Sequence, residues 1–516
     1  MSQQEAFLSA IEAGYTFKGD ALVLGGAMLD GKAQTGSFVQ IPMKMINRHG
    51  LIAGATGTGK TKTLQILAEQ LANKGVPSLL MDIKGDLSGV AVANAGHAKI
   101  DERHAQIGFP YEAAGSTVEF LSLSDEPGAK LRATVTEFGP ILFSKILDLS
   151  DVQAGIIAVL FKYCDDNGLP LIDLADLKRT LQFMTNEGKE EVQKEYGNMS
   201  ASSVGTIMRK ILALEQQGAD RFFGEKSFEV DDLCRIDSQG RGIISILRLT
   251  DLQDRPKLFA TFMMSLLAEV YSTFPERGDS ELPELVIFID EAHLIFEEAS
   301  DELLDQIEMI IKLIRSKGVG IYFVTQNPDD VPEAVLSQLG LKIQHSLRAF
   351  TAKDRKAIKL AVQNFPDSEF YHVEELITQL GIGEAFVTAL NEKGIPTPLV
   401  HTMLRAPQSR MDVLTDAEIK TILKSSALIH KYNEVIDRES AYEMLNAKVE
   451  AAKSADQRET MKQQAQAEQK VRPVKEEPSL IQELSKNTMV RQLGRTMARE
   501  LTRGILGVLG VGGKRR

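Results

Sequence analysis

Hydrophobic residues gather in short continuous runs along most of the chain, and segments with an apolar residue every three or four positions lie between them. Continuous runs of this length predict buried parallel strands, and the amphipathic segments predict the helices that connect them. We therefore predict an α/β fold with a mainly parallel sheet. The expected strands lie at 50–53, 76–82, 118–123, 242–249, 284–289, 319–325, 341–347 and 384–390.

Helical patterns and changes in composition divide the chain into domains. A helix that starts near residue 60 is expected after the strand 50–53 and a short loop, and a crossover helix is expected at 255–274. A further group of helices reads as a subdomain inserted in the α/β core. The predicted domains are a small N-terminal β element at 1–49, the core at 50–405 with the insertion at about 140–220, a polar helical or coiled-coil segment at 406–470, a linker at 471–478 and a basic amphipathic tail at 479–516.

The bulk composition is that of a soluble globular protein with more than one domain. The chain has 516 residues, of which 43% are hydrophobic and 25% charged, and this length favours two or three domains. The net charge of −12 argues against a nucleic-acid-binding face over the whole surface, but it is compatible with basic residues lining a pore. Cys164 and Cys234 lie far apart and imply neither a disulfide framework nor a zinc site. With no signal peptide and no membrane-spanning run, we expect a cytoplasmic protein.

One short segment carries a strong phosphate-binding signature. Residues 54–61 read Gly-Ala-Thr-Gly-Thr-Gly-Lys-Thr and fit the pattern G-x-x-x-x-G-K-[ST] between a predicted strand and a predicted helix. The glycines allow backbone N–H groups to turn toward phosphate oxygens, and the helix directs its positive end at the same anion. Lys60 would bind the β- and γ-phosphates of ATP, and Thr61 would bind Mg²⁺. The predicted nucleotide-binding residues are Gly54, Ala55, Thr56, Gly57, Thr58, Gly59, Lys60, Thr61 and Lys62.

Two carboxylates follow the strongest apolar run of the chain. The run 284–289 ends in Asp290 and Glu291, which places both at the tip of a buried parallel strand. Asp290 would hold Mg²⁺ through the water shell of the ion. Glu291 is positioned to polarise the attacking water, which is the general-base position of many ATPases. The two motifs together predict a Mg²⁺-dependent ATPase.

Polar residues at other strand ends have two interpretations each. Asp82 and Asp86 follow the strand 76–82 and lie either near Mg²⁺ and the reacting phosphate or in a solvated turn. Gln326 follows the strand 319–325 and either hydrogen-bonds the γ-phosphate or the attacking water, or caps the turn before Pro328. The sequence leaves both alternatives open.

The order of these motifs over residues 15–405 resembles that of the HerA-like branch of the HerA/FtsK superfamily of ring-forming P-loop ATPases, and most closely its bacterial YjgR group. The resemblance implies a RecA-like core, a homohexameric ring, and ATP hydrolysis at subunit interfaces that moves double-stranded DNA through a central pore. The motifs that carry it are the phosphate loop, Asp82-Ile83-Lys84-Gly85-Asp86, the helical insertion, Asp290-Glu291-Ala292-His293, Arg315-Ser316-Lys317-Gly318 and Val324-Thr325-Gln326.

The resemblance also implies roles for individual residues. It repeats the roles given above to the phosphate loop and to the two carboxylates, and it makes Gln326 a sensor of the bound nucleotide. The family has an arginine that reaches the γ-phosphate of the neighbouring subunit, and Arg315 matches it best, with Arg348 as a second candidate. Surface salt bridges are the alternative for both arginines. The short segment 1–49 leaves no room for the N-terminal barrel with which relatives dock a nuclease, which argues against a nuclease partner.

Three functions remain open. The first is a ring-forming helicase or translocase that acts on double-stranded DNA. The second is a P-loop ATPase that works as a switch or scaffold, recruited to a membrane surface or a protein partner by its basic tail. That tail, residues 479–516, carries eight Lys and Arg against two Glu, a net charge of +6, with leucines near one helical face. The third is a ring that threads protein. Only the first predicts that DNA accelerates ATP turnover.

Overall fold

The computed structural model describes residues 2–253, 255–278, 280–296, 301–434, 436 and 438–469. The predicted linker at 471–478 and the predicted basic tail at 479–516 therefore lie outside the described residues. The chain forms two compact units. The first consists of residues within 1–132, 217–222 and 226–435, and the second of residues within 133–216, 223–225 and 436–516.

Twelve strands within the described residues of the first unit form one sheet, in the order β2-β1-β12-β11-β10-β3-β9-β8-β4-β7-β5-β6. The strands from β10 to β6 in this order pair in parallel, and β11, β12, β1 and β2 add an antiparallel extension. The predicted α/β class with a mainly parallel sheet is confirmed. The strands are β1 (Ala21–Leu29), β2 (Lys32–Pro42), β3 (Gly50–Ala53), β4 (Ser78–Asp82), β5 (Val118–Ser122), β6 (Ala129–Lys130), β7 (Ile244–Arg248), β8 (Leu285–Ile289), β9 (Val319–Thr325), β10 (Leu341–Gln344), β11 (Glu384–Thr388) and β12 (Val400–Leu404).

Helices cover both faces of this sheet. They are α1 (Gln3–Tyr15), α2 (Lys60–Asn73), α3 (Ala98–Ile107), α9 (Pro256–Thr273), α10 (His293–Phe296), α11 (Asp301–Ile314), α12 (Glu333–Leu336), α13 (Ala352–Gln363), α14 (Val373–Leu376), α15 (Asp416–Lys424) and α16 (Ala427–Tyr432). The 3₁₀ turns are η1 (Met43–Arg48), η2 (Ser88–Ala91), η3 (Ala219–Arg221), η4 (Val230–Cys234), η5 (Thr250–Leu252), η6 (Arg315–Lys317) and η7 (Pro328–Asp330).

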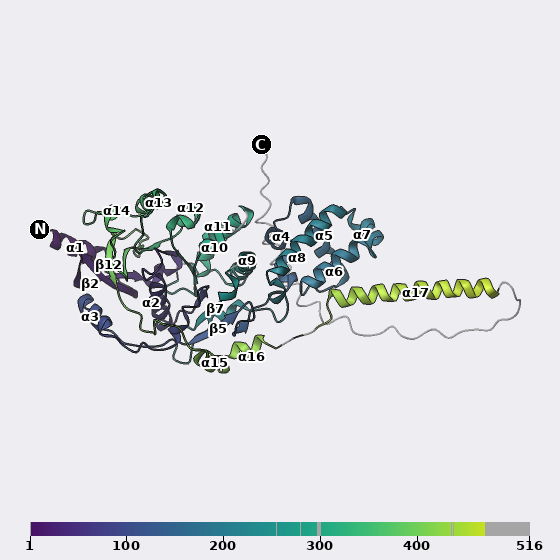
Figure 1. Cartoon of the computed structure of the whole chain (residues 1–516), viewed down its shortest axis with the longest axis horizontal. Coiled ribbons are helices and arrows are strands. Elements are labelled where there is room, and N and C mark those ends of the chain that lie inside the picture. Colours follow the sequence, from purple (N-terminus) through teal and green to yellow (C-terminus); the bar gives the residue numbers. More distant parts are fainter. Residues whose placement is uncertain are drawn as a thin grey trace. The chain divides into compact units, whose positions relative to one another are not determined.

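Helix α2 buries an apolar stripe against one face of the sheet. Leu64, Leu67 and Leu71 recur at helical spacing and pack in one core with Ile52 of β3 and Val324 of β9. The opposite face near β10 and β11 carries a second, smaller core, over which α13 and α14 lie side by side (Figure 1). Burial on both faces explains why the central strands are continuous apolar runs. Helix α2, which follows the phosphate loop, is thereby packed firmly against β3.

The N-terminal residues belong to the same sheet. β1 pairs with β12 and β2 pairs with β1, both antiparallel, so the segment continues the sheet beyond β11. Helix α1 is fastened to it by Tyr15, whose buried hydroxyl donates to Pro398 O at 2.7 Å and lies 3.1 Å from Val387 O. A strand near the N-terminus, β1, thus pairs with a strand near residue 400.

The second unit is helical. It contains α4 (Val135–Ile146), α5 (Asp151–Asn167), α6 (Leu174–Thr185), α7 (Lys189–Tyr196), α8 (Ala201–Gln216) and α17 (Ala441–Gln469). The start of α17 packs on α6, where the carboxylate of Asp176 accepts from Tyr442 N at 2.8 Å and from the hydroxyl of Ser440 at 2.5 Å. Beyond these contacts α17 continues as one long helix whose residues 450–463 are exposed (Figure 1). Its polar composition explains this exposure, because it offers no apolar stripe to bury.

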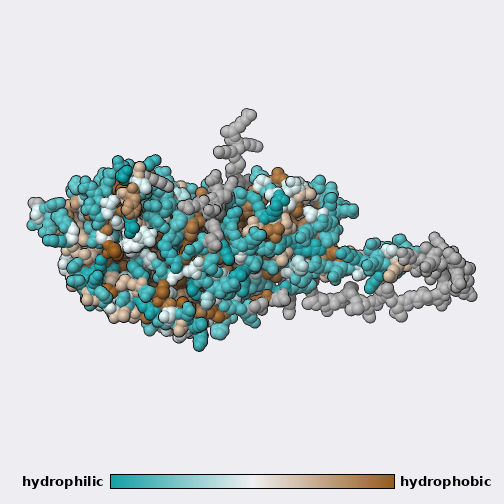
Figure 2. All heavy atoms as spheres, viewed as in Figure 1, coloured by the Kyte–Doolittle hydropathy of each residue, from teal (hydrophilic) through white to brown (hydrophobic). Residues whose placement is uncertain are grey.

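The visible surface is mostly hydrophilic. On the face drawn in Figure 2, hydrophobic residues form small separate patches among hydrophilic ones. Scattered apolar side chains of this kind are normal for a globular protein surface. In the part of the chain that the structure describes, no helix has the length and hydrophobicity needed to cross a membrane.

Candidate active site

The central strands end together at one edge of the sheet. β3 pairs with β9 so that Ala53 lies opposite Thr325, and it pairs with β10 so that Ala53 also lies opposite Gln344. β8 runs alongside β9 with Ile289 opposite Phe323. We call this the carboxyl edge, and loops after β3, β4, β8, β9 and β10 project from it. Ligands of open α/β sheets bind at this edge, so the predicted site residues were expected here.

Residues that follow β10 and precede β11 pack closely against the phosphate loop. Gly54 has φ = 152°, and a Cβ there would lie 2.5 Å from Cβ of His345, so only glycine fits. His345 is fully buried, and its Nε2 lies 2.9 Å from the hydroxyl of Thr63 in α2. Burial and the nearby Lys60 ammonium lower its pKa to about 3, so the imidazole is neutral. The loop is also bound by the turn before β11, where Gly383 N donates to Thr58 O at 3.0 Å.

Lys60 and Thr61 present their polar groups to the space that the loop encloses. The Lys60 ammonium donates to Gly54 O at 2.7 Å and to Ala55 O at 3.2 Å, and its residue is only 6% exposed. Burial lowers the pKa of Lys60, and the nearby Lys84 ammonium lowers it further. The Thr61 hydroxyl donates to Oδ2 of Asp86 at 3.2 Å. These donors and the helix terminus form an anion-binding cradle.

Asp290 and Glu291 lie at the tip of β8, as the sequence predicts. They are 2% and 5% exposed. Burial raises the pKa of Asp290 to about 6, and its Oδ2 atom has no hydrogen-bond partner among the described residues. Glu291 has φ = 48°, a left-handed conformation that is uncommon for a residue with a side chain. Its carboxylate forms an ion pair with Lys84 and lies 3.1 Å from Nδ1 of His293.

These residues fit a magnesium ion that arrives with a nucleotide. Among the described residues, no three His, Cys, Asp or Glu side chains converge into a site that would hold a metal by themselves. A buried carboxylate oxygen without a partner, on Asp290, and a hydroxyl, on Thr61, are instead the sparse ligand set that Mg²⁺ supplements with water and phosphate oxygens. A bound cation would also favour the ionised form of Asp290.

The turn after β4 resolves the alternatives for Asp82 and Asp86. Asp82 is buried and accepts hydrogen bonds from the backbone N–H groups of Gly85, Asp86 and Leu87 at 2.7–3.2 Å. Its carboxylate therefore shapes the turn from a buried position, and burial raises its pKa to about 7. Asp86 instead reaches Thr61 and so belongs to the phosphate site.

The remaining predicted residues are divided between two edges. Gln326 is exposed directly after β9, beside the phosphate loop, since Gly54 N donates to Thr325 O at 3.2 Å. The Arg348 guanidinium donates to Thr56 O at 3.3 Å and so lies next to its own phosphate loop. Arg315 lies in η6, before β9 begins, which places it at the other edge of the sheet, about 20 Å away along the strand. Within one chain Arg315 is not part of the site.

Sequence reasoning missed two residues of this site. Lys84 was quoted as part of a motif but given no role, and His345 was not singled out. A charged or polar residue just past a buried strand was a usable signal for both, since Lys84 follows β4 and His345 follows β10. What each contacts could not be read from the sequence, because Glu291 and Thr63 lie more than two hundred residues away.

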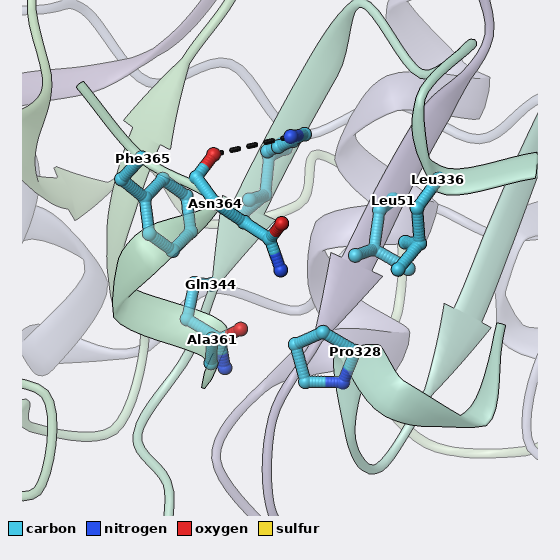
Figure 3. A pocket seen from close by; sticks show the side chains of 9 residues that line it. Leu51, Pro328, Leu336, Gln344, Ala361, Asn364 and Phe365 are labelled. Carbon is cyan, nitrogen blue, oxygen red and sulfur yellow. Dashed lines mark hydrogen bonds between the residues drawn. The ribbon is translucent and has the colours of Figure 1, made fainter. Parts of the chain in front are cut away.

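A small pocket near β10 is separate from this site (Figure 3). Leu51, Lys342 and Gln344 occupy alternate positions on β3 and β10 and so face the side of the sheet away from α2. The Lys342 ammonium donates to Asn364 O at 3.1 Å at the end of α13. Apolar side chains such as Phe365 and Leu336 line much of the rest. The pocket belongs to the packing of α13 on the sheet and lacks a phosphate cradle.

Comparison with known proteins identifies the family. The sequence profile of the family described as Helicase HerA-like C-terminal matches residues 28–516. The DNA double-strand break repair helicase HerA of Sulfolobus acidocaldarius is 22% identical over 380 residues, which cover 70% of this chain and 66% of that protein. A probable helicase of Methanocaldococcus jannaschii is 24% identical over 398 residues, covering 71% of this chain and 68% of its own length. The chain thus spans about two thirds of the length of these curated relatives.

Solved structures agree on the fold. The plasmid coupling protein TrwB, in a complex with ADP and Mg²⁺, superposes with a TM-score of 0.50 at 16% identity, and the match covers 77% of this chain and 99% of that one. At this identity the likeness concerns the fold alone, which is a RecA-like P-loop core. The RecA-like core expected from the sequence is confirmed.

Proposed function

The chain belongs to the HerA-like helicase family, and on that premise we propose that it is a Mg²⁺-dependent ATPase that works as a ring-forming motor on double-stranded DNA. The observation that carries the proposal is the meeting of Asp290 and Glu291 with Lys60 and Thr61 at the carboxyl edge. Two buried carboxylates beside a phosphate loop are the arrangement that ATP hydrolysis needs. A cytoplasmic location remains part of the proposal.

The phosphate loop binds the nucleotide. Backbone N–H groups of residues 54–61 and the start of α2 bind the phosphates of ATP, and Lys60 exchanges its present carbonyl partners for β- and γ-phosphate oxygens. Thr61 and Asp290 would hold Mg²⁺. When bound, the ion would neutralise charge on the phosphates.

Hydrolysis uses the second carboxylate. Glu291 takes a proton from a water molecule while the water oxygen bonds to the γ-phosphorus, and the bond from that phosphorus to the bridging oxygen breaks. The electron pair of this bond leaves with ADP, and inorganic phosphate is the second product. His293, 3.1 Å from Glu291, orients the carboxylate. Gln326 hydrogen-bonds the γ-phosphate or the water and so senses which nucleotide is bound.

Two arginines complete the site in the proposed hexamer. Arg348 acts on the nucleotide of its own chain, since it lies beside Thr56. Arg315, at the opposite edge, acts only on the nucleotide of a neighbouring subunit. A guanidinium supplied across an interface neutralises charge that develops in the transfer and couples the subunits.

Rings assembled from two kinds of mutant subunit test these roles of Arg315 and Arg348. Arg315→Ala and Glu291→Gln subunits are each expected to be inactive alone, but their mixture should regain part of the ATP turnover, because some interfaces then combine an intact Glu291 with an intact neighbouring Arg315. Arg348→Ala is the matched control: mixed with Glu291→Gln it should regain none. Recovery with Arg348→Ala, or no recovery with Arg315→Ala, would reject the assignment.

Double-stranded DNA is expected to accelerate ATP turnover. The measurement is steady-state hydrolysis with and without linear duplex, at about 50 and 200 mM salt, because contacts to phosphates weaken steeply over this range. Stimulation should be strong at low salt and should fade at high salt. A Lys60→Ala preparation excludes contaminating ATPases, and single-stranded DNA of the same length tests strand preference. Robust turnover that ignores DNA at both salts would contradict a DNA motor and favour an ATPase recruited by its tail to another partner.

A further inference from the structure

The turn after β4 holds one side chain in a fixed place. Asp82 accepts three backbone hydrogen bonds from within the turn, and at Gly85 the chain has φ = 77°. A Cβ on Gly85 would lie 2.8 Å from Cγ2 of Thr250, so the turn also packs closely against its neighbour. Lys84 lies inside this rigid turn. The side chain therefore leaves the backbone from a position that the fold determines.

The ammonium of Lys84 lies among the charged groups of the phosphate site. It forms an ion pair with Oε1 of Glu291, which is 7% exposed at its side chain, whereas Lys84 is 34% exposed. Burial alone would lower the pKa of Lys84, but the charges of Asp290, Glu291 and Asp86 outweigh it and raise the pKa. Lys84 is also the charge that acts most strongly on Lys60.

This position adjoins Lys60, on which the proposed function places the terminal phosphate of ATP. Lys60 of the phosphate loop contacts β- and γ-phosphates in P-loop proteins, and the two charges that act most strongly on it are Lys84, after β4, and Glu291, after β8. Two ammonium groups beside one enclosed space attract a polyanion. Glu291 pairs with one of them, Lys84, and its backbone has φ = 48° at this point.

We propose that Lys84 is a second γ-phosphate-binding residue that exchanges Glu291 for the γ-phosphate when ATP binds. The inference rests on the proposed ATPase function and deepens it. The Lys84 ammonium then binds the γ-phosphate, and Glu291 is released to bind the attacking water. ADP lacks this phosphate, so with ADP the ion pair persists and the carboxylate stays occupied. Lys84 thereby links the presence of a complete substrate to the availability of the base.

The test compares a non-hydrolysable ATP analogue with ADP, both in the presence of Mg²⁺. Lys84→Met should weaken binding of the analogue about 10–100-fold, the loss expected for a hydrogen bond to a charged group, and should change ADP affinity less than about threefold. Lys84→Arg should restore most of the preference for the analogue. Equal weakening of both nucleotides, or of neither, would overturn the proposal. Equal melting temperatures of the variants would show that the fold is intact.

A second variant tests the exchange from the side of Glu291, and its first measurement does not depend on Lys84→Met. Glu291→Gln removes the competing partner, so it should tighten binding of the analogue about fivefold, as expected for release of a half-exposed ion pair. This gain should be absent when Lys84→Met is combined with it. A gain that persists without Lys84 would overturn the exchange. If the unaltered protein bound neither nucleotide, the proposed function itself would fail, which separates the two failures.

Discussion

Replacing Lys60 by alanine is expected to abolish nucleotide binding and to reduce ATP turnover about 10³-fold or more. The Lys60 ammonium is the group of the phosphate loop that binds the β- and γ-phosphates. The only other positive charge in the segment 54–62 is Lys62 at its end. Lys60 is buried, so no mobile surface lysine can replace it. Affinity is measured with a fluorescent ATP analogue, and turnover by phosphate release.

Lys74→Ala is the matched control. Lys74 directly follows the other end of α2, is partly exposed and pairs with Asp20 at 3.0 Å, so its removal should leave both measurements unchanged. Because Lys60 also binds two carbonyl groups of the loop, the melting temperature of Lys60→Ala should be compared with that of the unaltered protein. A folded Lys60→Ala variant that binds ATP normally would show that the loop is not the nucleotide site.

Replacing Glu291 by glutamine is expected to lower kcat about 10²–10⁴-fold while leaving ATP bound. Glutamine keeps the shape of the side chain but cannot accept the proton of the attacking water. It also cannot form the ion pair with Lys84, so the affinity for ATP should not fall. Single-turnover hydrolysis gives the chemical rate, and retention of labelled ATP on the protein shows that binding persists.

A carboxylate elsewhere on the same unit provides the control for Glu291→Gln. Glu308 lies on α11, is partly exposed and pairs with Lys312 one turn away, so Glu308→Gln should hydrolyse ATP at the parental rate. Parental turnover by Glu291→Gln would reject the assignment of the base. The salt bridge of Glu308 is also of the exposed kind that contributes little to stability.

Long apolar runs with polar tips were predictable because they depend on neighbours in sequence. The strands expected at 76–82, 319–325 and 384–390 are β4, β9 and β11 with ends shifted by only a few residues, and the crossover helix expected at 255–274 is α9. In each case burial on both faces requires a continuous apolar run, and the residue type that ends the run is visible. The phosphate loop and the two carboxylates of β8 were found in the same way.

The antiparallel side of the sheet was not predictable in the same way. β12 follows β11 after a short connection and was not among the expected strands, and β1 pairs with it from almost four hundred residues away. β12 has only five residues, and a strand this short carries little local signal, because its partners decide whether it forms. The described part of the segment 406–470, predicted as polar and helical, contains three helices rather than one. Thr415 and Ser426 cap two separate short helices, α15 and α16, before α17 begins.

The sequence by itself therefore determined the class of the fold, the phosphate loop, and the carboxylates that end β8. Each of these features depends on residues that are close together in the sequence, so the local pattern of spacing and polarity predicts it. Only the tertiary structure decided that Lys84 pairs with Glu291, that His345 supports the phosphate loop, and that Arg348 and Arg315 lie at opposite edges of the sheet. These relations join strands that are adjacent in the sheet but distant along the chain, and the order of strands in a sheet is set by packing, which no local pattern specifies.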